Sequence, residues 1–348
     1  MGEKATKAVD RMGGIESALQ SITVAVDAMG GDHAPQVVLE GVRQALDADA
    51  QLSIILTGNA ESIEAFSKEE QLSGRVEAVA ASEFIDMDEH PALAVRRKKD
   101  SSVVVGCQLV NDGRAKAFFS AGSTGASMAA AIMYIGRIKG VHRPAIASVI
   151  PSPDGPVILT DIGANADVKA KYLLQFAQMA GIYAERILNV ENPRIGLLNI
   201  GEEETKGTEI VQEAYRLMKE KLPGFCGNAE GNDILSGRFD VIVTDGFTGN
   251  ITLKTIEGTA SALFDQLKEI LMSSIARKIA ASVIMPGLKG LKKSLSADEV
   301  GGAPLLGLKG TCIIGHGSSN AKAIANGIAV AATCVRERVP EIIAEAVE

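Results

Sequence analysis

The strongest constraint on the fold is a unit that recurs along the chain: a strand-like run, a turn rich in glycine or small polar residues, and then apolar residues at helical spacing. The clearest strand-like runs are residues 22–26, 115–119, 157–160, 241–244 and 311–314. Weaker runs lie at 52–56, 76–80, 145–150 and 194–199. Alternating strands and helices are typical of α/β proteins with a parallel sheet. The sequence therefore predicts an α/β fold with a large, mainly parallel sheet.

The length of 348 residues allows about two domains, or one large α/β domain. The first 20 residues match no strand or helix pattern, so we expect a loose N-terminal extension there. We predict one large α/β domain over 21–348. Residues 255–300 interrupt the alternation with a long helical pattern that bends at Pro286 and Gly287, which predicts an inserted helical hairpin for dimer or membrane contact.

Composition and charge exclude several classes of protein. The net charge of −8 and the absence of tryptophan argue against nucleic-acid binding, which needs a broad basic surface or stacking aromatic side chains. The spacing of the four cysteines matches no zinc motif or disulfide framework, so we expect them to be reduced. No signal peptide and no membrane span are predicted. We expect a cytoplasmic protein, with a peripheral position at the inner membrane face as an open alternative.

Ligands of open parallel sheets bind beyond the carboxyl ends of the strands, so the glycine-rich turns are the candidate site. Small residues and hydroxyls at such a turn can bind an anion, although they also serve as helix caps. We predict anion binding by one turn, through Ser120, Gly122, Ser123, Thr124 and Gly125. The residues assigned to substrate binding lie in the other turns: Asp27, Gly30, Gly31, Asp32, His33, Asp161, Asn165, Asp167, Asp245, Gly246, Gly317 and Ser318.

The aspartates in these turns would repel phosphate unless they cap backbone amides, pair with lysine or hold a metal. We favour capping and pairing, and predict no metal. No Walker A motif is present, and the nearest dinucleotide fingerprint starts at Gly315 but has Asn320 in place of its third glycine. We therefore predict no cofactor, and keep a dehydrogenase that uses NAD at the Gly315 turn as an alternative.

Eight motifs, in order along the chain, resemble those of the bacterial phosphate acyltransferases of phospholipid synthesis. They are ITVAVDAMGGDHAP (22–35), AVRRKK (94–99), SAGSTGA (120–126), DIGANAD (161–167), GLLNIGEEETKG (196–207), GNAEG (227–231), VTDGFTGN (243–250) and HGSSN (316–320). The resemblance implies transfer of a fatty acyl group from acyl carrier protein to inorganic phosphate, giving an acyl phosphate for a membrane-bound glycerol-phosphate acyltransferase. It also implies a homodimer and a three-layer α/β/α fold related to phosphotransacetylases and isopropylmalate dehydrogenases.

This reaction depends on hydrogen-bond donors more than on an activated nucleophile. Phosphate is already nucleophilic, and a thiol with a pKa near ~8.5 leaves readily, so the pocket must orient phosphate and stabilise an oxyanion. We assign these roles to Lys206 and Asn250, with Lys254, Lys169 and His316 in support. Each lysine could instead lie on a solvated helix face.

An acidic enzyme needs a local cationic surface to bind an acidic carrier protein. Two basic segments offer one: Arg96, Arg97, Lys98 and Lys99, and Arg277, Lys278, Lys289, Lys292 and Lys293. The second segment also suits a membrane surface or a dimer interface. A non-enzymatic scaffold that binds carrier protein and lipid is the remaining alternative.

Overall fold

The structure is a computed structural model that describes residues 21–69, 72, 74–274, 277–278, 281, 284–285, 287, 290 and 300–347. The predicted extension 1–20, the bend residue Pro286 and Lys289, Lys292 and Lys293 lie outside the described residues. The chain divides into two compact units. Unit 1 runs to Ile138 and includes Leu308–Ile342, whereas unit 2 takes in Lys139–Gly307 and Ile343–Glu348. The single domain expected over 21–348 stays a prediction.

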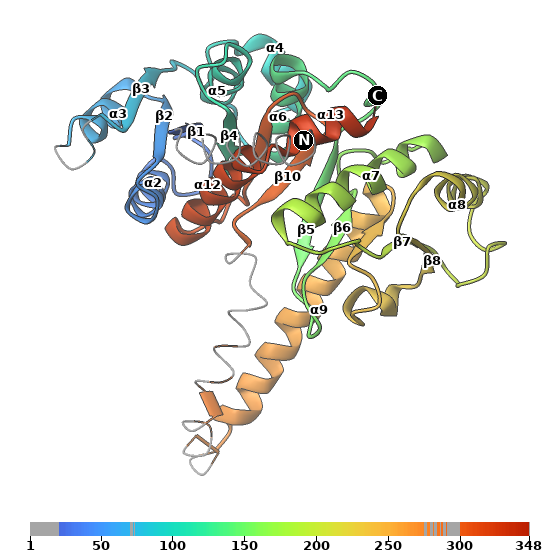
Figure 1. Ribbon diagram of the computed structural model, residues 1–348. Coiled ribbons are helices and arrows are strands. Elements are labelled where there is room, and N and C mark those ends of the chain that lie inside the picture. Colours follow the sequence, from blue (N-terminus) through green and yellow to red (C-terminus); the bar gives the residue numbers. More distant parts are fainter. Residues whose placement is uncertain are drawn as a thin grey trace, which may run out of the picture. The chain divides into compact units, whose positions relative to one another are not determined.

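The described elements of unit 1 are β1 (Ile22–Asp27), α2 (Gln36–Ala48), β2 (Leu52–Gly58), α3 (Ala60–Ser67), β3 (Val76–Ala80), α4 (Pro91–Arg97), α5 (Ser102–Asn111), β4 (Ala117–Ser120), α6 (Thr124–Ala130), a π-helical turn (Ala131–Ile135), β11 (Thr311–Ile314) and α12 (Ala321–Arg336). Helix α13 (Val339–Val347) follows α12 (Figure 1). The described elements of unit 2 are β5 (Ala145–Ile150), β6 (Val157–Thr160), α7 (Ala170–Ile187), β7 (Ile195–Leu198), α8 (Glu209–Lys221), β8 (Phe225–Ala229), a 3-10 turn (Gly231–Leu235), β9 (Val241–Val243), α9 (Gly246–Met272) and β10 (Ala303–Leu306).

In unit 1 the strands are all parallel and stand in the order β3-β2-β1-β4-β11. Helices pack on the sheet and against one another at very short range, which glycines allow. A Cβ on Gly106 of α5 would lie 2.4 Å from the Phe118 ring, and one on Gly41 of α2 would lie 2.6 Å from Ile324 of α12. All four residues of β4 are buried, as expected for a central strand covered on both faces.

In unit 2 the strand order is β10-β5-β6-β9-β7-β8. Strands β6, β9, β7 and β8 pair in parallel, while β5 runs antiparallel to both β6 and β10. One core cluster contains Val157, Leu159, Phe239 and Ile242, each at most 2% exposed. The α/β class with a large, mainly parallel sheet is thus confirmed.

All nine strand-like runs of the sequence form strands, but β8 and β10 were not predicted. Strand β8 has the sequence FCGNA, whose glycine and asparagine disfavour a strand reading. Strand β10 contains Pro304, which disfavours a strand, and its residues come directly after the helical pattern predicted over 255–300. In the part of the chain that the structure describes, no helix has both the length and the apolar character needed to cross a bilayer.

Helix α9 is 27 residues long and confirms the long helix predicted after Asn250. Figure 1 shows it extending away from the sheet of unit 2. Only Gly246 and Gly249, both in its first turn, are buried. A Cβ on Gly249 would lie 1.9 Å from the Asp161 carbonyl oxygen, so the helix begins in direct backbone contact with the turn after β6.

We expect Gly249→Ala to lower the free energy of unfolding by about 3 kcal/mol or more, because the added methyl overlaps a backbone carbonyl that cannot move away cheaply. Gly258→Ala is the matched control on the same helix: no atom lies within 4 Å of its Cβ position. Alanine there should leave stability unchanged or raise it by up to about 1 kcal/mol. Urea unfolding measures both, and equal effects of the two substitutions would contradict the close seating of α9.

Candidate functional site

Three of the predicted turns meet at one corner of unit 1. They follow the carboxyl ends of β1, β4 and β11, which are neighbours in the sheet. The Gly315 N–H donates to the Ser120 carbonyl oxygen at 2.8 Å, and the Asp32 N–H donates to the Gly317 carbonyl oxygen at 2.8 Å. The sequence argument that these turns share an edge is therefore correct for unit 1.

A buried hydrogen-bond chain organises this corner. Ser120 Oγ donates to Asp27 Oδ2 at 2.7 Å and accepts from the Gly122 N–H at 3.0 Å, while Asp27 Oδ1 accepts from the Met29 N–H. A Cβ on Gly30 would lie within 2.8 Å of Gly122 N, Asp27 Oδ2 and Ser120 Oγ. No larger residue fits at this position, so the two turns touch through their backbones.

Burial raises the pKa of the Asp27 carboxyl above its ordinary value, while hydrogen bonds with Ser102, Ser120 and the Met29 amide act in the opposite direction. The side chain is only 3% exposed. Desolvation disfavours the charged form because a low-dielectric interior solvates it poorly. Because it accepts the Met29 N–H, Asp27 has the capping role predicted for the turn aspartates.

A cavity of about 270 Å³ opens beside this hydrogen-bond chain. Its lining includes Gly30, Gly31, Gly122 and Ser123, and its charged lining residues, Asp27 and Asp86, are acidic. Ser123 also caps α6, since its Oγ accepts from the Ala126 N–H at 3.4 Å.

The other phosphate and substrate candidates of unit 1 do not line this cavity. Gly125 packs against α4, where a Cβ would lie 2.6 Å from Pro91 Cγ. His316 is exposed, and its Nδ1 lies 2.8 Å from Ser318 Oγ. The remaining candidates that lie outside the lining are Ser120, Thr124, Asp32, His33 and Gly317. Asn320, which replaces the third glycine of the dinucleotide fingerprint, caps α12 by accepting from the Ala323 N–H at 2.9 Å.

In unit 2 the turn after β6 is built around Asp161, which is fully buried. Its carboxylate accepts backbone N–H groups from Ile146, Ala164 and Asn165, at 2.7 to 3.1 Å. Burial raises the pKa of Asp161 in spite of these bonds. The Asn165 side chain is used within the fold, because its Nδ2 donates to the Pro144 carbonyl oxygen and to Asp161 Oδ2, both at 2.8 Å.

Asp245 caps the N-terminus of α9. Its Oδ1 accepts from the Thr248 N–H and its Oδ2 accepts from Thr248 Oγ1, both at 2.8 Å. Gly246 follows, and its N–H donates to the Asn165 carbonyl oxygen at 2.7 Å. The turns after β6 and β9, which are neighbouring strands, therefore meet in unit 2 as predicted.

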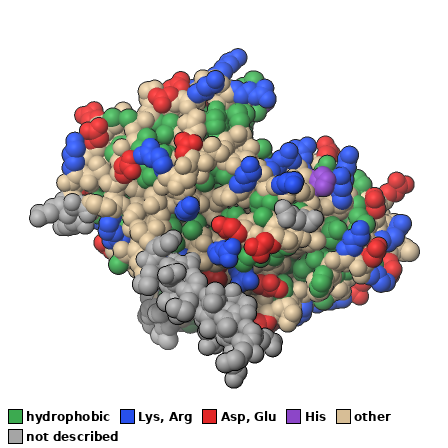
Figure 2. All heavy atoms as spheres, turned by 45° about the horizontal axis from the view of Figure 1, so that its top comes forward, with side chains coloured by type: hydrophobic (Ala, Val, Ile, Leu, Met, Phe, Trp, Pro, Cys, Tyr) green, Lys and Arg blue, Asp and Glu red, His purple; other side chains and the backbone are tan. Residues whose placement is uncertain are grey.

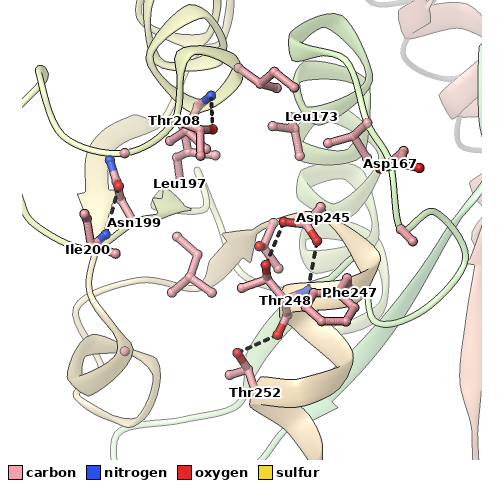
Figure 3. Close-up of a pocket in the computed structure, with 18 residues that line it drawn as sticks. Asp167, Leu173, Leu197, Asn199, Ile200, Thr208, Asp245, Phe247, Thr248 and Thr252 are labelled. Atoms are coloured by element: carbon pink, nitrogen blue, oxygen red, sulfur yellow. Dashed lines mark hydrogen bonds between the residues drawn. The ribbon is translucent and has the colours of Figure 1, made fainter.

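A cavity of about 930 Å³ lies beside these turns, between the start of α9, the start of α8 and the loop after β7 (Figure 3). Its walls are mainly apolar and its polar groups are few, as in sites for small organic ligands. The apolar lining includes Leu173, Leu197, Leu198, Ile200, Ile210, Val211 and Phe247. The polar lining includes Asp167, Asn199, Thr208, Thr244, Asp245, Thr248 and Thr252. Ile200 is 81% exposed and Phe247 is 63% exposed, so two large apolar side chains beside the cavity are open to solvent.

The loop after β7 is held closed by side-chain amides. Asn199 Nδ2 donates to the Lys206 carbonyl oxygen at 3.1 Å, and Asn228 Nδ2 donates to the Glu203 carbonyl oxygen at 3.0 Å. Gly207 has a φ of +85°, and a Cβ there would lie 2.5 Å from Asn199 Oδ1. Lys206 therefore sits on a fixed loop that borders the cavity.

The residues predicted to be catalytic are exposed and none lines either cavity: Lys169, Lys206, Asn250, Lys254 and His316. Lys254 forms an ion pair with Glu257 at 2.8 Å. In the portion of the chain that is described, Lys206 has no ion pair. Lys206 directly precedes Gly207, which lines the larger cavity. Asn250 lies between two lining residues, Thr248 and Thr252. Neither Lys206 nor Asn250 lines the cavity itself.

Sequence reasoning missed the apolar walls of the larger cavity. Asn199 and Ile200 lie within the quoted motif at 196–207, and Phe247 lies within the quoted turn at 243–250. The sequence did contain a signal for these walls: an isoleucine and a phenylalanine lie inside glycine-rich turns. Large apolar residues in an exposed turn do not pack in the core, so they indicate a binding surface.

The two basic segments differ in their surroundings. Lys98 is half-buried, with its Nζ 2.5 Å from Glu89 Oε1 and 2.9 Å from the Phe84 carbonyl oxygen, whereas Arg96, Arg97 and Lys99 are exposed. Arg277 and Lys278 are also exposed. Figure 2 shows basic and acidic side chains interspersed over the visible face.

A family model described as "Fatty acid synthesis protein" matches residues 22–342. The phosphate acyltransferase of Desulfitobacterium hafniense (strain DSM 10664 / DCB-2) is 52% identical over 276 residues, which cover 79% of this chain and 83% of the relative. That of Heliobacterium modesticaldum is 51% identical over 279 residues, covering 80% and 83%.

Two solved structures have a similar fold. The phosphotransacetylase from Streptococcus pyogenes aligns with a TM-score of 0.58 at 17% identity, covering 98% of this chain and 100% of the other. A branched-chain phosphotransacylase from Enterococcus faecalis aligns with a TM-score of 0.55 at 14% identity, covering 91% and 98%. At this identity the likeness concerns the fold alone, and it confirms the predicted relation to phosphotransacetylases.

The raised pKa of Asp27 predicts a pH dependence of stability. Since the folded-state pKa lies above the ordinary value of 3.8, the folded protein keeps this proton where the unfolded chain has lost it. The contribution of Asp27 to stability is therefore greatest at low pH and falls as pH rises from about 4 through the folded-state pKa. Asp27→Asn has no carboxyl to titrate, so this decline should disappear. The free energy of unfolding of the variant minus that of the unmodified protein should therefore rise across this pH window, by about 1.4 kcal/mol for each pH unit between the ordinary and the folded-state pKa.

Urea unfolding between pH 4 and about pH 8 measures this difference. The exposed Asp32→Asn in the same turn controls for the loss of one surface carboxylate. A pH profile for Asp27→Asn that is parallel to that of the unmodified protein would contradict the assignment.

Proposed function

Because the chain belongs to the phosphate acyltransferase family, we propose that it transfers a fatty acyl group from the thioester of acyl carrier protein to inorganic phosphate. The product is an acyl phosphate, which a membrane-bound glycerol-phosphate acyltransferase consumes in phospholipid synthesis. The protein is an acyltransferase by family membership. Its acyl donor and its acceptor are the proposal.

The observation that supports this proposal best is the cavity of about 930 Å³ in unit 2. It lies beyond the carboxyl ends of β6, β7 and β9, where parallel sheets bind ligands. Leucine, isoleucine and phenylalanine side chains form its walls, and burial of each methylene of an acyl chain there contributes about 0.8 kcal/mol. We assign the acyl chain of the donor to this cavity.

We assign inorganic phosphate to the corner of unit 1, on the turn Ser120–Gly125. Gly30, Gly31 and Gly122 line the cavity at this corner, and Ser123 adds a hydroxyl. The buried Asp27 carboxyl lies at this corner. Burial raises the pKa of this carboxyl above its ordinary value.

The chemistry proceeds by addition and elimination. A phosphate oxygen forms a bond to the thioester carbonyl carbon, and the carbonyl electron pair moves to its oxygen. Collapse of this tetrahedral oxyanion breaks the carbon–sulfur bond, and the pantetheine leaves as a thiolate whose pKa is near ~8.5, that of a free thiol. Lys206 and Asn250 are proposed to orient phosphate or stabilise the oxyanion, with Lys169, Lys254 and His316 in support.

We propose that the acidic carrier protein docks on the exposed cations Arg96, Arg97 and Lys99, and that Arg277 and Lys278 provide a second cationic surface. Rim charges of this kind raise association rates more than affinity. The protein is proposed to act as a homodimer in the cytoplasm, with peripheral contact to the membrane that holds the next enzyme.

The test of function is release of free thiol from an acyl carrier protein thioester, which should occur only when phosphate is present. Lys206→Ala should lower the rate by about 10²-fold or more while the unfolding midpoint is unchanged, because one oxyanion donor contributes about 3 kcal/mol. Lys221→Ala, another exposed lysine of unit 2, is the control. Thiol release without phosphate would overturn the proposal, and reduction of NAD would support the dehydrogenase alternative.

Phe247→Ala should raise the KM for a long-chain acyl donor by about tenfold and have a much smaller effect on a short-chain donor, since it removes part of an apolar wall. Leu235→Ala removes another exposed apolar side chain of unit 2, one that lies outside the cavity, and should leave both values unchanged. Equal changes for long and short donors in Phe247→Ala would place the acyl chain elsewhere.

A further inference from the structure

Lys206 lies on the segment 199–208, which joins β7 to α8 in unit 2. Asn199 and Thr208, at the two ends of this segment, both line the larger cavity (Figure 3). The Lys206 side chain is exposed. A long, exposed lysine side chain has many rotamers, so its ammonium group reaches one position reliably only if the backbone beneath it is fixed.

Gln212, in α8, binds the backbone on both sides of Lys206. Its Nε2 donates to the Thr205 carbonyl oxygen at 2.8 Å and to the Gly207 carbonyl oxygen at 3.2 Å. A side-chain amide nitrogen has two hydrogens, so these two bonds use both of them. The opposite orientation of the amide would place its oxygen against two other oxygens, which can only accept. Gln212 thus fixes a carbonyl group on each side of Lys206.

The rest of Lys206 also has close neighbours. Its carbonyl oxygen accepts from Asn199 Nδ2 at 3.1 Å, and its N–H donates to the Glu203 carbonyl oxygen at 3.1 Å. A Cβ on the buried Gly201 would lie 3.1 Å from Lys206 Cγ and 3.5 Å from Lys206 Cδ. The aliphatic part of the lysine therefore packs over the Cα of this glycine.

Two glutamates beside Lys206 bind other cations. Glu202 forms an ion pair with Arg238, and Glu204 forms one with Lys219. These partners hold two of the neighbouring carboxylates, which would otherwise compete with an anionic substrate for the Lys206 ammonium group.

We propose that Gln212 is a positioning residue, which holds the backbone of Lys206 so that the ammonium group meets the phosphate or the oxyanion of the acyl transfer reaction. This role rests on the function proposed for Lys206. Gln212 is not part of the cavity lining, so it acts through the segment 199–208 rather than on the substrate. A displacement of about 1 Å at a reacting group can lower a rate by about 10²-fold.

Gln212→Met keeps the length of the side chain and removes both donors. At saturating phosphate, kcat for thiol release from the acyl carrier protein thioester should fall about tenfold, because Lys206 loses its position. KM for the thioester should change by less than about twofold, because the cavity walls are intact. Gln178→Met makes the same substitution on α7, outside the cavity lining, and should leave kcat and KM unchanged.

The Lys206→Ala background separates positioning from a general structural role. If Gln212 acts through Lys206, Gln212→Met should not lower kcat further in Lys206→Ala, since the effects of residues that act as a unit are not additive. An equal fall of kcat in both backgrounds, or an unchanged kcat in Gln212→Met alone, would overturn the positioning role.

Hydrogen–deuterium exchange of the full-length protein tests the same role without the reaction. In Gln212→Met the Lys206 amide should exchange about tenfold faster, while the amides of β7 keep their protection. Unchanged exchange at Lys206 would overturn the positioning role. Absence of phosphate-dependent thiol release from the unmodified protein would instead overturn the proposed function, and the exchange rates would then decide alone whether Gln212 holds Lys206 in place.

Discussion

The turns of both candidate sites depend on carboxylates that have almost no contact with water. Asp27 is the last residue of β1 in unit 1, and Asp161 directly follows β6 in unit 2. Each accepts hydrogen bonds from the turn that comes next and from a neighbouring strand. A turn at the end of a strand leaves several backbone N–H groups without ladder partners, and these groups must be satisfied if they are to be buried. One side chain with four lone pairs meets that requirement and leaves room for a ligand beside it.

These carboxylates also explain why so many neighbouring positions are glycine. The carboxylate occupies the space where neighbouring side chains would otherwise lie, so Gly30 and Gly246 approach it with their Cα atoms. The resulting corners are small, rigid and nearly free of side chains. Such corners suit a reaction that needs positioning and oxyanion stabilisation more than an activated nucleophile.

The sequence specified the fold better than the cavities. The five strong strand-like runs could be recognised because each is mainly apolar and is followed directly by aspartate, serine or glycine. Strand β8 was not readable, since its pairing with β7 overrides the weak propensity of Gly227 and Asn228. Capping by Asp27, Asp161 and Asp245 was also predictable from their place after strands. The walls formed by Leu173 and Val211 were not, because their helices meet the β7 loop only in the folded chain.

The seating of α9 on Asp161 has a geometric consequence. A helix of 27 residues is about 40 Å long, so a rotation of about 5° at its first turn would displace the opposite end by about 3.5 Å. Backbone contact at Gly246 and Gly249 leaves almost no freedom for such a rotation. The direction of the longest helix in the described chain thus depends on two positions where glycine has a hydrogen atom in place of a side chain.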